Sequence, residues 1–122
     1  AIYDLPTRVV GISADDPAAS IRDTVRTVIT GMGELLGVDA VAFANARPLE
    51  VDDTFVGEGY GVPTAASREA VGLLARSEAV FLDHTYTAKA MAGLLSYVRR
   101  GVFPANQTVL FWHTGGQVGL FV

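Results

Sequence analysis

Two polar segments stand directly after apolar runs and carry side chains that are suited to chemistry. Residues 83–87 read Asp-His-Thr-Tyr-Thr and follow the run 79–82, and residues 113–116 read His-Thr-Gly-Gly and follow the run 108–112. Their hydroxyl groups can donate and accept hydrogen bonds, and adjacent glycines let backbone amides come close to an anion. The plainer alternatives are a helix cap with one packed aromatic ring for the first segment and an ordinary tight turn for the second.

A third candidate is Tyr60, which lies between Gly59 and Gly61. The surrounding residues 38–63 show an irregular pattern, and we expect them to form a long loop. Long loops inside a compact domain are usually functional. The alternative is a surface tyrosine that packs by one edge.

Lys89 is the only lysine in the chain and therefore invites an interpretation as a Schiff-base residue. It lies in the interior of a predicted helix, and we interpret it instead as a structural or solvated helix lysine. The two histidines, His84 and His113, are far apart in the sequence and have no carboxylate at ligand spacing. We therefore expect no metal site.

Short β-branched and aromatic runs alternate with helical patterns along the chain. The predicted strands are 8–13, 79–82 and 108–112, and the later predicted helices are 65–76 and 87–100, the second ended by Gly101. Strands that alternate with helices predict a parallel α/β sheet with right-handed crossovers. Ligands of such sheets bind at the carboxyl ends of the strands, where the two polar segments lie.

The first predicted helix carries the clearest apolar stripe. We expect Asp15 or Asp16 to cap it, Pro17 to stand in its first turn and Gly37 to end it. The residues of the stripe recur at helical spacing and are Ile21, Val25, Val28, Ile29, Met32, Leu35 and Leu36. This stripe predicts a helix that packs against the rest of a domain.

Composition and charge exclude several classes of protein. The chain has 122 residues, of which 50% are hydrophobic and 18% are charged, and its net charge is -4. This composition predicts a folded domain without a nucleic-acid partner and without a membrane span. The first residues do not resemble a signal peptide, and the absence of cysteine fits a cytoplasmic protein. Because the chain ends on the apolar residues 120–122, we expect that the natural sequence continues beyond it.

Three stretches, 59–64, 82–94 and 109–116, resemble in order and spacing the C-terminal part of a known enzyme family. The family is that of D-cysteine desulfhydrases and 1-aminocyclopropane-1-carboxylate deaminases, which are pyridoxal-phosphate (PLP) enzymes of the tryptophan-synthase-β-like class. The resemblance covers essentially residues 1–122. It implies a three-layer α/β fold, in which helices flank a parallel sheet. This chain would be the C-terminal part of the large domain of such an enzyme.

The resemblance also implies roles for individual residues. Tyr86 and Tyr60 resemble two neighbouring active-site tyrosines close to the substrate and the cofactor ring. Thr87 matches the position that meets the pyridine nitrogen, which is glutamate in the deaminases. Thr114, beside the cofactor-binding Gly115, matches a position that is leucine in the deaminases and threonine in the desulfhydrases. Threonine at both positions favours a desulfhydrase.

Other parts of the family pattern differ or are missing. Residues 117–121 depart from the usual Pro-Ala-Leu-Phe continuation, and His84 with Thr85 replaces the commoner Pro-Val. The Schiff-base lysine, a Ser-Asn segment that binds the substrate carboxylate and the phosphate-binding glycine loop all precede Ala1 in the family. We therefore expect this polypeptide to be inactive alone and to require the missing N-terminal part of the same protein.

The resemblance implies a cytoplasmic, homodimeric PLP-dependent lyase. The expected reaction converts D-cysteine, or a related small β-substituted amino acid, to pyruvate, ammonia and the leaving group. The alternatives of the same class are an aminocyclopropane-carboxylate deaminase and an L-cysteate sulfo-lyase. The alternative of another class is a truncated, non-catalytic binding module.

Overall fold

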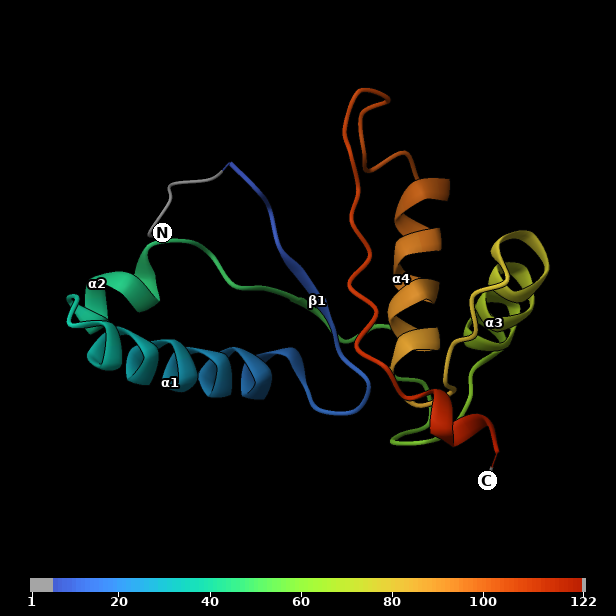
Figure 1. Ribbon diagram of the computed structural model, residues 1–122, viewed down its shortest axis with the longest axis horizontal. Helices are drawn as coiled ribbons and strands as arrows, with labels where there is room; N and C mark the ends of the chain where they lie inside the picture. The colour runs from blue at the N-terminus through green and yellow to red at the C-terminus, as the bar shows by residue number, and fades with distance from the viewer. Residues whose placement is uncertain (1–5, 122) are drawn as a thin grey trace.

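The computed structural model describes residues 6–121 (Figure 1). The first five residues and Val122, which bear on the expectations about a signal peptide and an apolar end, lie outside the described residues. The elements in chain order are β1 (Val10–Ile12), α1 (Ala18–Leu36), α2 (Ala40–Asn45), β2 (Glu50–Asp52), α3 (Ala65–Glu78), α4 (Thr87–Arg99) and the 3-10 helix η1 (Gln117–Leu120). None of the helices described is long and apolar enough to cross a bilayer.

The two strands form a small parallel sheet. β1 and β2 pair with Val10 opposite Glu50, and the pairing continues to Ile12 opposite Asp52. Arg8 supports this register, because its Nε and Nη2 atoms donate to the two carboxylate oxygens of Glu50 at 2.7 and 2.6 Å. The predicted first strand and the predicted parallel sheet are confirmed, but the partner strand β2 was not predicted. The prediction of one long loop over 38–63 was wrong, because this region contains both α2 and β2.

The two ends of helix α1 are defined differently, one by a glycine and the other by a remote carboxylate. It ends at Gly37, as predicted, where φ is +66°. The predicted aspartate cap was wrong, because Pro17 is the capping residue and makes no side-chain cap bond. The free amide of Ala18 instead donates to Oδ2 of Asp53 at 2.7 Å. A carboxylate from a distant loop therefore replaces the local cap.

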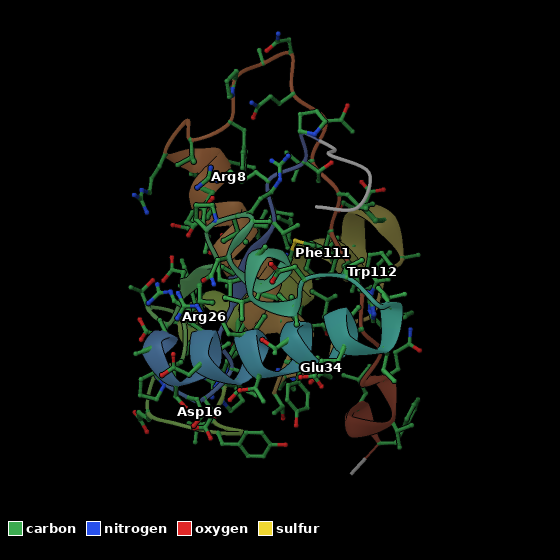
Figure 2. All side chains as sticks on the ribbon, turned by 90° about the vertical axis from the view of Figure 1, so that its left-hand side faces the viewer. Arg8, Asp16, Arg26, Glu34, Phe111 and Trp112 are labelled. Carbon is green, nitrogen blue, oxygen red and sulfur yellow. The ribbon has the colours of Figure 1, made fainter. Side chains whose placement is uncertain are left out.

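The apolar stripe of α1 is largely exposed in the described chain. Val28, Met32, Leu35 and Leu36 are exposed, and Leu35 reaches 90%. Helix α2 packs against α1, and Arg22 on α1 donates to the carbonyl oxygens of Leu49 and Val51 at 3.1 and 3.0 Å. Figure 2 shows Arg26 and Glu34 on the same helix, where both are exposed. The expectation that this stripe is buried is thus not met within the described residues.

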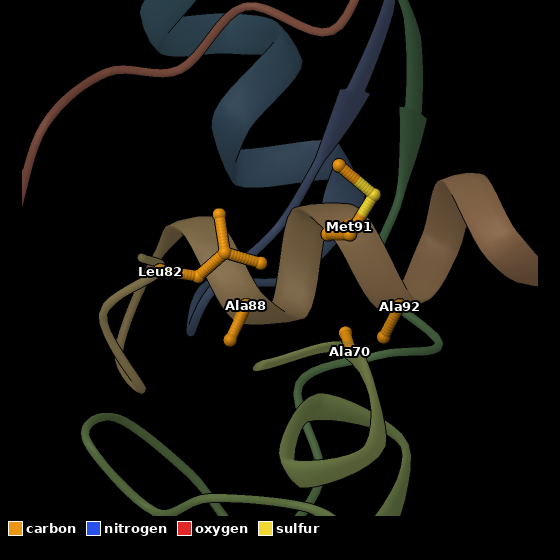
Figure 3. Packing of buried hydrophobic residues seen from close by; sticks show 5 residues of the cluster. All are labelled: Ala70, Leu82, Ala88, Met91 and Ala92. Atoms are coloured by element: carbon orange, nitrogen blue, oxygen red, sulfur yellow. The ribbon is translucent and has the colours of Figure 1, made fainter. Parts of the chain in front are cut away.

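The core lies between α3 and α4. Its fully packed members are mostly small and are Ala70, Leu82, Ala88, Met91 and Ala92 (Figure 3). Helix α3 begins with a capping box, in which Thr64 Oγ1 accepts from the Ser67 amide at 3.0 Å and Ser67 Oγ accepts from the Thr64 amide at 2.9 Å. Both helices occur where the sequence predicts them, with Gly101 in a left-handed conformation after α4.

Helix α4 also joins the core to the sheet. A Cβ atom on Gly93 would lie 2.9 Å from Cδ1 of Ile12, so a larger residue at this position would require the Ile12 side chain to shift. The Tyr97 hydroxyl donates to Oδ2 of Asp52 at 2.7 Å. Burial, together with this hydrogen bond, raises the pKa of Tyr97 to about 12. The end of β2 is thereby fastened to α4.

The two later predicted strands were wrong. Segments 79–82 and 108–112 are not strands in the structure. Their apolar side chains still pack, since Leu82 is in the core and Val80 and Phe111 contact it, while Trp112 is exposed (Figure 2). A strand requires a neighbour for its backbone hydrogen bonds, and the sheet of the described residues has only two members. The structure is therefore a mixed α/β arrangement with a small parallel sheet.

Candidate active site

Tyr60 and Tyr86 meet at the N-terminal end of α4. Their hydroxyl groups are hydrogen-bonded to each other. Their ring centroids lie 5.7 Å apart in an edge-to-face arrangement of 69°. Both phenols are exposed, at 57% and 48%, and can reach a ligand. The predicted approach of the two tyrosines is confirmed, and their catalytic role stays a prediction.

The carboxylate of Asp83 organises the turn that carries Tyr86. Oδ2 accepts from the amides of Thr85 and Tyr86 at 2.9 and 2.7 Å, and Oδ1 accepts from the amide of Thr87 at 2.9 Å. Burial alone would raise the pKa of Asp83, but the hydrogen bonds from Thr87 and from the turn amides outweigh it and lower the pKa. The carboxylate therefore stays ionised where the dipole of α4 also favours negative charge.

Asp83 was not singled out as a functional residue from the sequence. The signal was present, because an Asp shortly before a predicted helix is a common turn and capping residue. It is the residue that fixes the backbone of both Tyr86 and Thr87.

Thr87 is buried, and its hydroxyl makes two hydrogen bonds to Asp83. Oγ1 donates to Oδ1 of Asp83 at 2.6 Å and accepts from the Asp83 amide at 2.9 Å. A hydroxyl has one proton and two lone pairs, so one lone pair of Thr87 is left for another donor. The predicted contact of Thr87 with a cofactor stays a prediction.

The segment 113–116 lies close to Asp83. A Cβ atom on Gly116, whose φ is +88°, would come within 2.5 Å of Oδ1 of Asp83, so this approach requires glycine. Thr114 is exposed, whereas the Gly115 amide donates to Nδ1 of His113 at 3.1 Å. Nε2 of His113 then carries the proton and donates to the carbonyl of Phe81 at 3.1 Å. The structure thus brings the third predicted site segment to the same end of α4, while the ligand contacts of Thr114 and Gly115 stay predictions.

Lys89 is fully buried. Its Nζ atom donates to the carbonyl oxygen of Gly59 at 2.7 Å and to that of Ala14 at 2.9 Å. The interpretation of Lys89 as a structural lysine is confirmed, and the solvated alternative was wrong.

Among residues 6–121, no three histidine, aspartate or glutamate side chains gather into a group that could hold a metal ion. His84 has a buried Nδ1 atom without a hydrogen-bond partner.

Comparison with known proteins identifies the family. A family described as "Pyridoxal-phosphate dependent enzyme" matches residues 3–115. A protein of Rhizobium leguminosarum bv. viciae named 1-aminocyclopropane-1-carboxylate deaminase is 33% identical over 120 residues, which are 98% of this chain and 35% of that protein. Proteins of the same name from Methylobacterium nodulans and Ralstonia pickettii are 34% and 35% identical, over 93% and 89% of this chain and 33% and 32% of their own lengths. The chain thus spans about a third of the length of these curated relatives. With 113 of its residues inside the match, the chain belongs to the pyridoxal-phosphate dependent enzyme family.

Proposed function

We propose that this chain is the part of a PLP-dependent lyase that supplies the two active-site tyrosines. The proposed substrate is D-cysteine or a related small β-substituted amino acid, and the proposed products are pyruvate, ammonia and the leaving group. The observation that carries the proposal is the contact between the exposed hydroxyls of Tyr60 and Tyr86 at the start of α4. Two acid/base groups that share a hydrogen bond and open to ligand are suited to proton transfer.

The donor set fits a cofactor that this chain flanks and does not anchor. The phenols of Tyr60 and Tyr86 and the hydroxyl of Thr114 are exposed at one end of α4. Lys89 is the only lysine of the chain, and its buried Nζ atom is engaged by two carbonyl groups. The lysine that would bind PLP covalently therefore has to come from a residue outside this sequence.

When bound, PLP supplies an electron sink for the charge that develops on the substrate when its Cα proton leaves. The chain's own residues then hold and move protons. The hydrogen bond that Tyr86 shares with Tyr60, followed by burial, raises the pKa of Tyr86. Like any tyrosine, whose ordinary pKa is about 10, Tyr86 carries its phenolic proton at neutral pH and can donate it to a departing thiolate. Asp83 keeps the phenol in place through the Tyr86 amide.

The choice of D-cysteine over aminocyclopropane-carboxylate rests on the two threonines. The resemblance places glutamate and leucine at positions 87 and 114 of the deaminases. A carboxylate at the ring nitrogen would keep it protonated and suit ring opening, whereas a neutral hydroxyl suffices for loss of a good leaving group. The name of the relatives is the argument for the deaminase alternative. L-cysteate sulfo-lyase is the third candidate in the same class.

The decisive test uses a longer protein that contains this sequence together with a PLP-binding lysine. Pyruvate release is expected from D-cysteine, and the double variant Thr87→Glu with Thr114→Leu is expected to lower that activity and raise 2-oxobutanoate release from aminocyclopropane-carboxylate. Both single variants are measured as well, because neighbouring residues are not additive. PLP occupancy is checked by absorbance. An unchanged substrate preference in a fully loaded double variant would remove the support for a desulfhydrase, and a protein without any lyase activity would favour the binding-module alternative.

A further inference from the structure

We propose that Lys89 is a positioning residue, which holds Tyr60 against Tyr86 by binding the backbone of the loop that carries Tyr60. The inference depends on the proposed function in one respect, which is that the two tyrosines take part in the reaction. The hydrogen bonds themselves belong to the folded chain.

Lys89 is placed where three separate segments meet. It lies in the first turn of α4, three residues after Tyr86. Its Nζ atom reaches the carbonyl of Gly59, which is 30 residues away and directly precedes Tyr60. It also reaches the carbonyl of Ala14, 75 residues away, just after β1. One side chain thus connects the loop of Tyr60 to the helix of Tyr86.

The two carbonyl groups differ in how firmly they are held by their own surroundings. Ala14 follows the buried Ser13, whose amide donates to the carbonyl of Asp52 at 2.8 Å and whose hydroxyl donates to the carbonyl of Asp16 at 2.6 Å. Gly59 lies in a glycine-rich loop, with φ at +148°, and its carbonyl accepts locally from the Val62 amide at 3.3 Å. Lys89 therefore ties a loosely supported loop to a well-fixed turn.

A lysine is an unusual choice for a fully buried position. Moving an ammonium group out of water costs free energy, and hydrogen bonds to its N–H donors reduce that cost. The Lys89 Nζ atom donates to two carbonyl oxygens. An apolar side chain of similar length would fill the same space without this cost. What the lysine adds is directional hydrogen bonding to Gly59 and Ala14, which fixes the position of the Tyr60 loop.

The first measurement uses the unaltered 122-residue protein and requires no variant. Because Lys89 is the only lysine, labelling with 15N-lysine gives a single Nζ signal in NMR. We expect slow exchange of its protons with water and nuclear Overhauser contacts to the protons around Gly59. An Nζ signal that exchanges as fast as that of free lysine would overturn the proposal.

The second measurement asks whether the ammonium group, and not only its volume, holds the tyrosines. The chain has no cysteine, so a Lys89→Cys variant can be alkylated at one site in denaturant and refolded. Bromoethylamine restores an amine at the length of lysine, and bromoethanol gives a neutral control of the same length. The readout is the tyrosinate absorbance titration, with Tyr60→Phe as the reference for a Tyr86 phenol that lacks its partner.

We expect the aminoethylated protein to titrate like the wild type. In the hydroxyethylated protein, which keeps all four tyrosines, we expect Tyr86 to ionise at lower pH, as it does in Tyr60→Phe. Lys89→Met should behave like the hydroxyethylated protein, and Arg26→Met, which removes an exposed cation on α1, should behave like the wild type. A folded hydroxyethylated or Lys89→Met protein with the wild-type titration would show that Lys89 does not position Tyr60. If neither folds, the lysine NMR signal of the unaltered protein decides the question. None of these measurements depends on PLP or on catalysis, so the proposed lyase function can fail without affecting their outcome.

Discussion

The two halves of the chain bury their apolar side chains to very different extents. In the half built on α3 and α4, small residues pack helix against helix, and Leu82 is fully buried. In the half built on α1 and α2, the stripe of α1 faces solvent, and Leu35 is 90% exposed. Figure 1 shows the two helix pairs on either side of β1. The half that carries the tyrosines has a buried cluster between its helices, although Leu110 and Trp112 beside it are exposed, whereas most of the apolar stripe of α1 is exposed. The expected occupant of this stripe, the remainder of a longer protein of the family, stays a prediction.

The same substitution in each half tests this difference directly. Leu82→Ala removes a fully buried side chain and should lower the free energy of unfolding by about 2–5 kcal/mol. Leu35→Ala removes an exposed one and should change the free energy by no more than about 0.5 kcal/mol. Urea denaturation followed by circular dichroism measures both. A large loss for Leu35→Ala would mean that the stripe of α1 is covered in solution, for instance by a second copy of the chain.

Asp83 should give the α4 half a distinct dependence on acid. Asp83→Asn leaves amide donors of the turn without an acceptor and should cost about 1–3 kcal/mol at neutral pH. Because the pKa of Asp83 is lower in the folded state than its unfolded value of about 3.9, its contribution is complete above that value. The contribution is lost as the pH falls below about 4, through the folded pKa. The difference between wild type and variant should therefore narrow in acid.

Unfolding measured at several pH values between neutrality and strong acid tests this prediction. Asp23→Asn, which changes an exposed carboxylate on α1, is the control. A gap between wild type and Asp83→Asn that stays constant through the acid range would contradict the proposed ionised state of Asp83.

Tyr97 joins the sheet to the α4 half, and its loss should have a smaller effect. Tyr97→Phe removes the hydrogen bond to Asp52 and should lower the free energy of unfolding by about 1 kcal/mol. The folded pKa of about 12 lies above the unfolded value of about 10, so the contribution of Tyr97 is complete below pH 10 and is lost as the pH rises through 12. Wild type and variant should thus converge in alkali, and urea unfolding at several pH values between neutrality and alkali measures this convergence.

We expect that Lys89 of the folded chain does not react with PLP. Incubation of the chain with PLP, followed by borohydride reduction and peptide mapping, should leave Lys89 unlabelled because its Nζ atom is buried and bonded to two carbonyls. The same treatment in denaturant provides the positive control, since unfolding exposes the amine. Stoichiometric labelling of the folded chain would show that Lys89 is accessible and would contradict its structural role.

The parts of the fold that follow from neighbouring residues were predicted well. Helices α3 and α4 and the stop of α1 at Gly37 appear in the spacing of apolar residues and in the terminal glycines. The predicted strands at 79–82 and 108–112 show the limit of such patterns. An apolar run indicates burial, but it does not supply the neighbour that a strand requires.

The sequence predicted which residues form the candidate site, but only some of the hydrogen bonds between them. The approach of Tyr60 to Tyr86 followed from the family resemblance and is seen in the structure. The role of Asp83 and the two partners of Lys89 were missed, because these partners include backbone groups, which every residue possesses and which leave no pattern in a sequence. A buried lysine also looks like any helix lysine until the surrounding loops are placed.

By itself, the sequence determined α1, α3 and α4, the glycines that end α1 and α4, and the polar segments at the site, since these depend on contacts within a few residues. Only the tertiary structure decided that β2 pairs with β1, that Asp53 caps α1 from 35 residues away and that Lys89 binds Ala14 across 75 residues. The physical reason is that helix hydrogen bonds close locally along the chain. Strand pairing, a remote cap and a buried ammonium group each need a partner that only the folded backbone brings within reach.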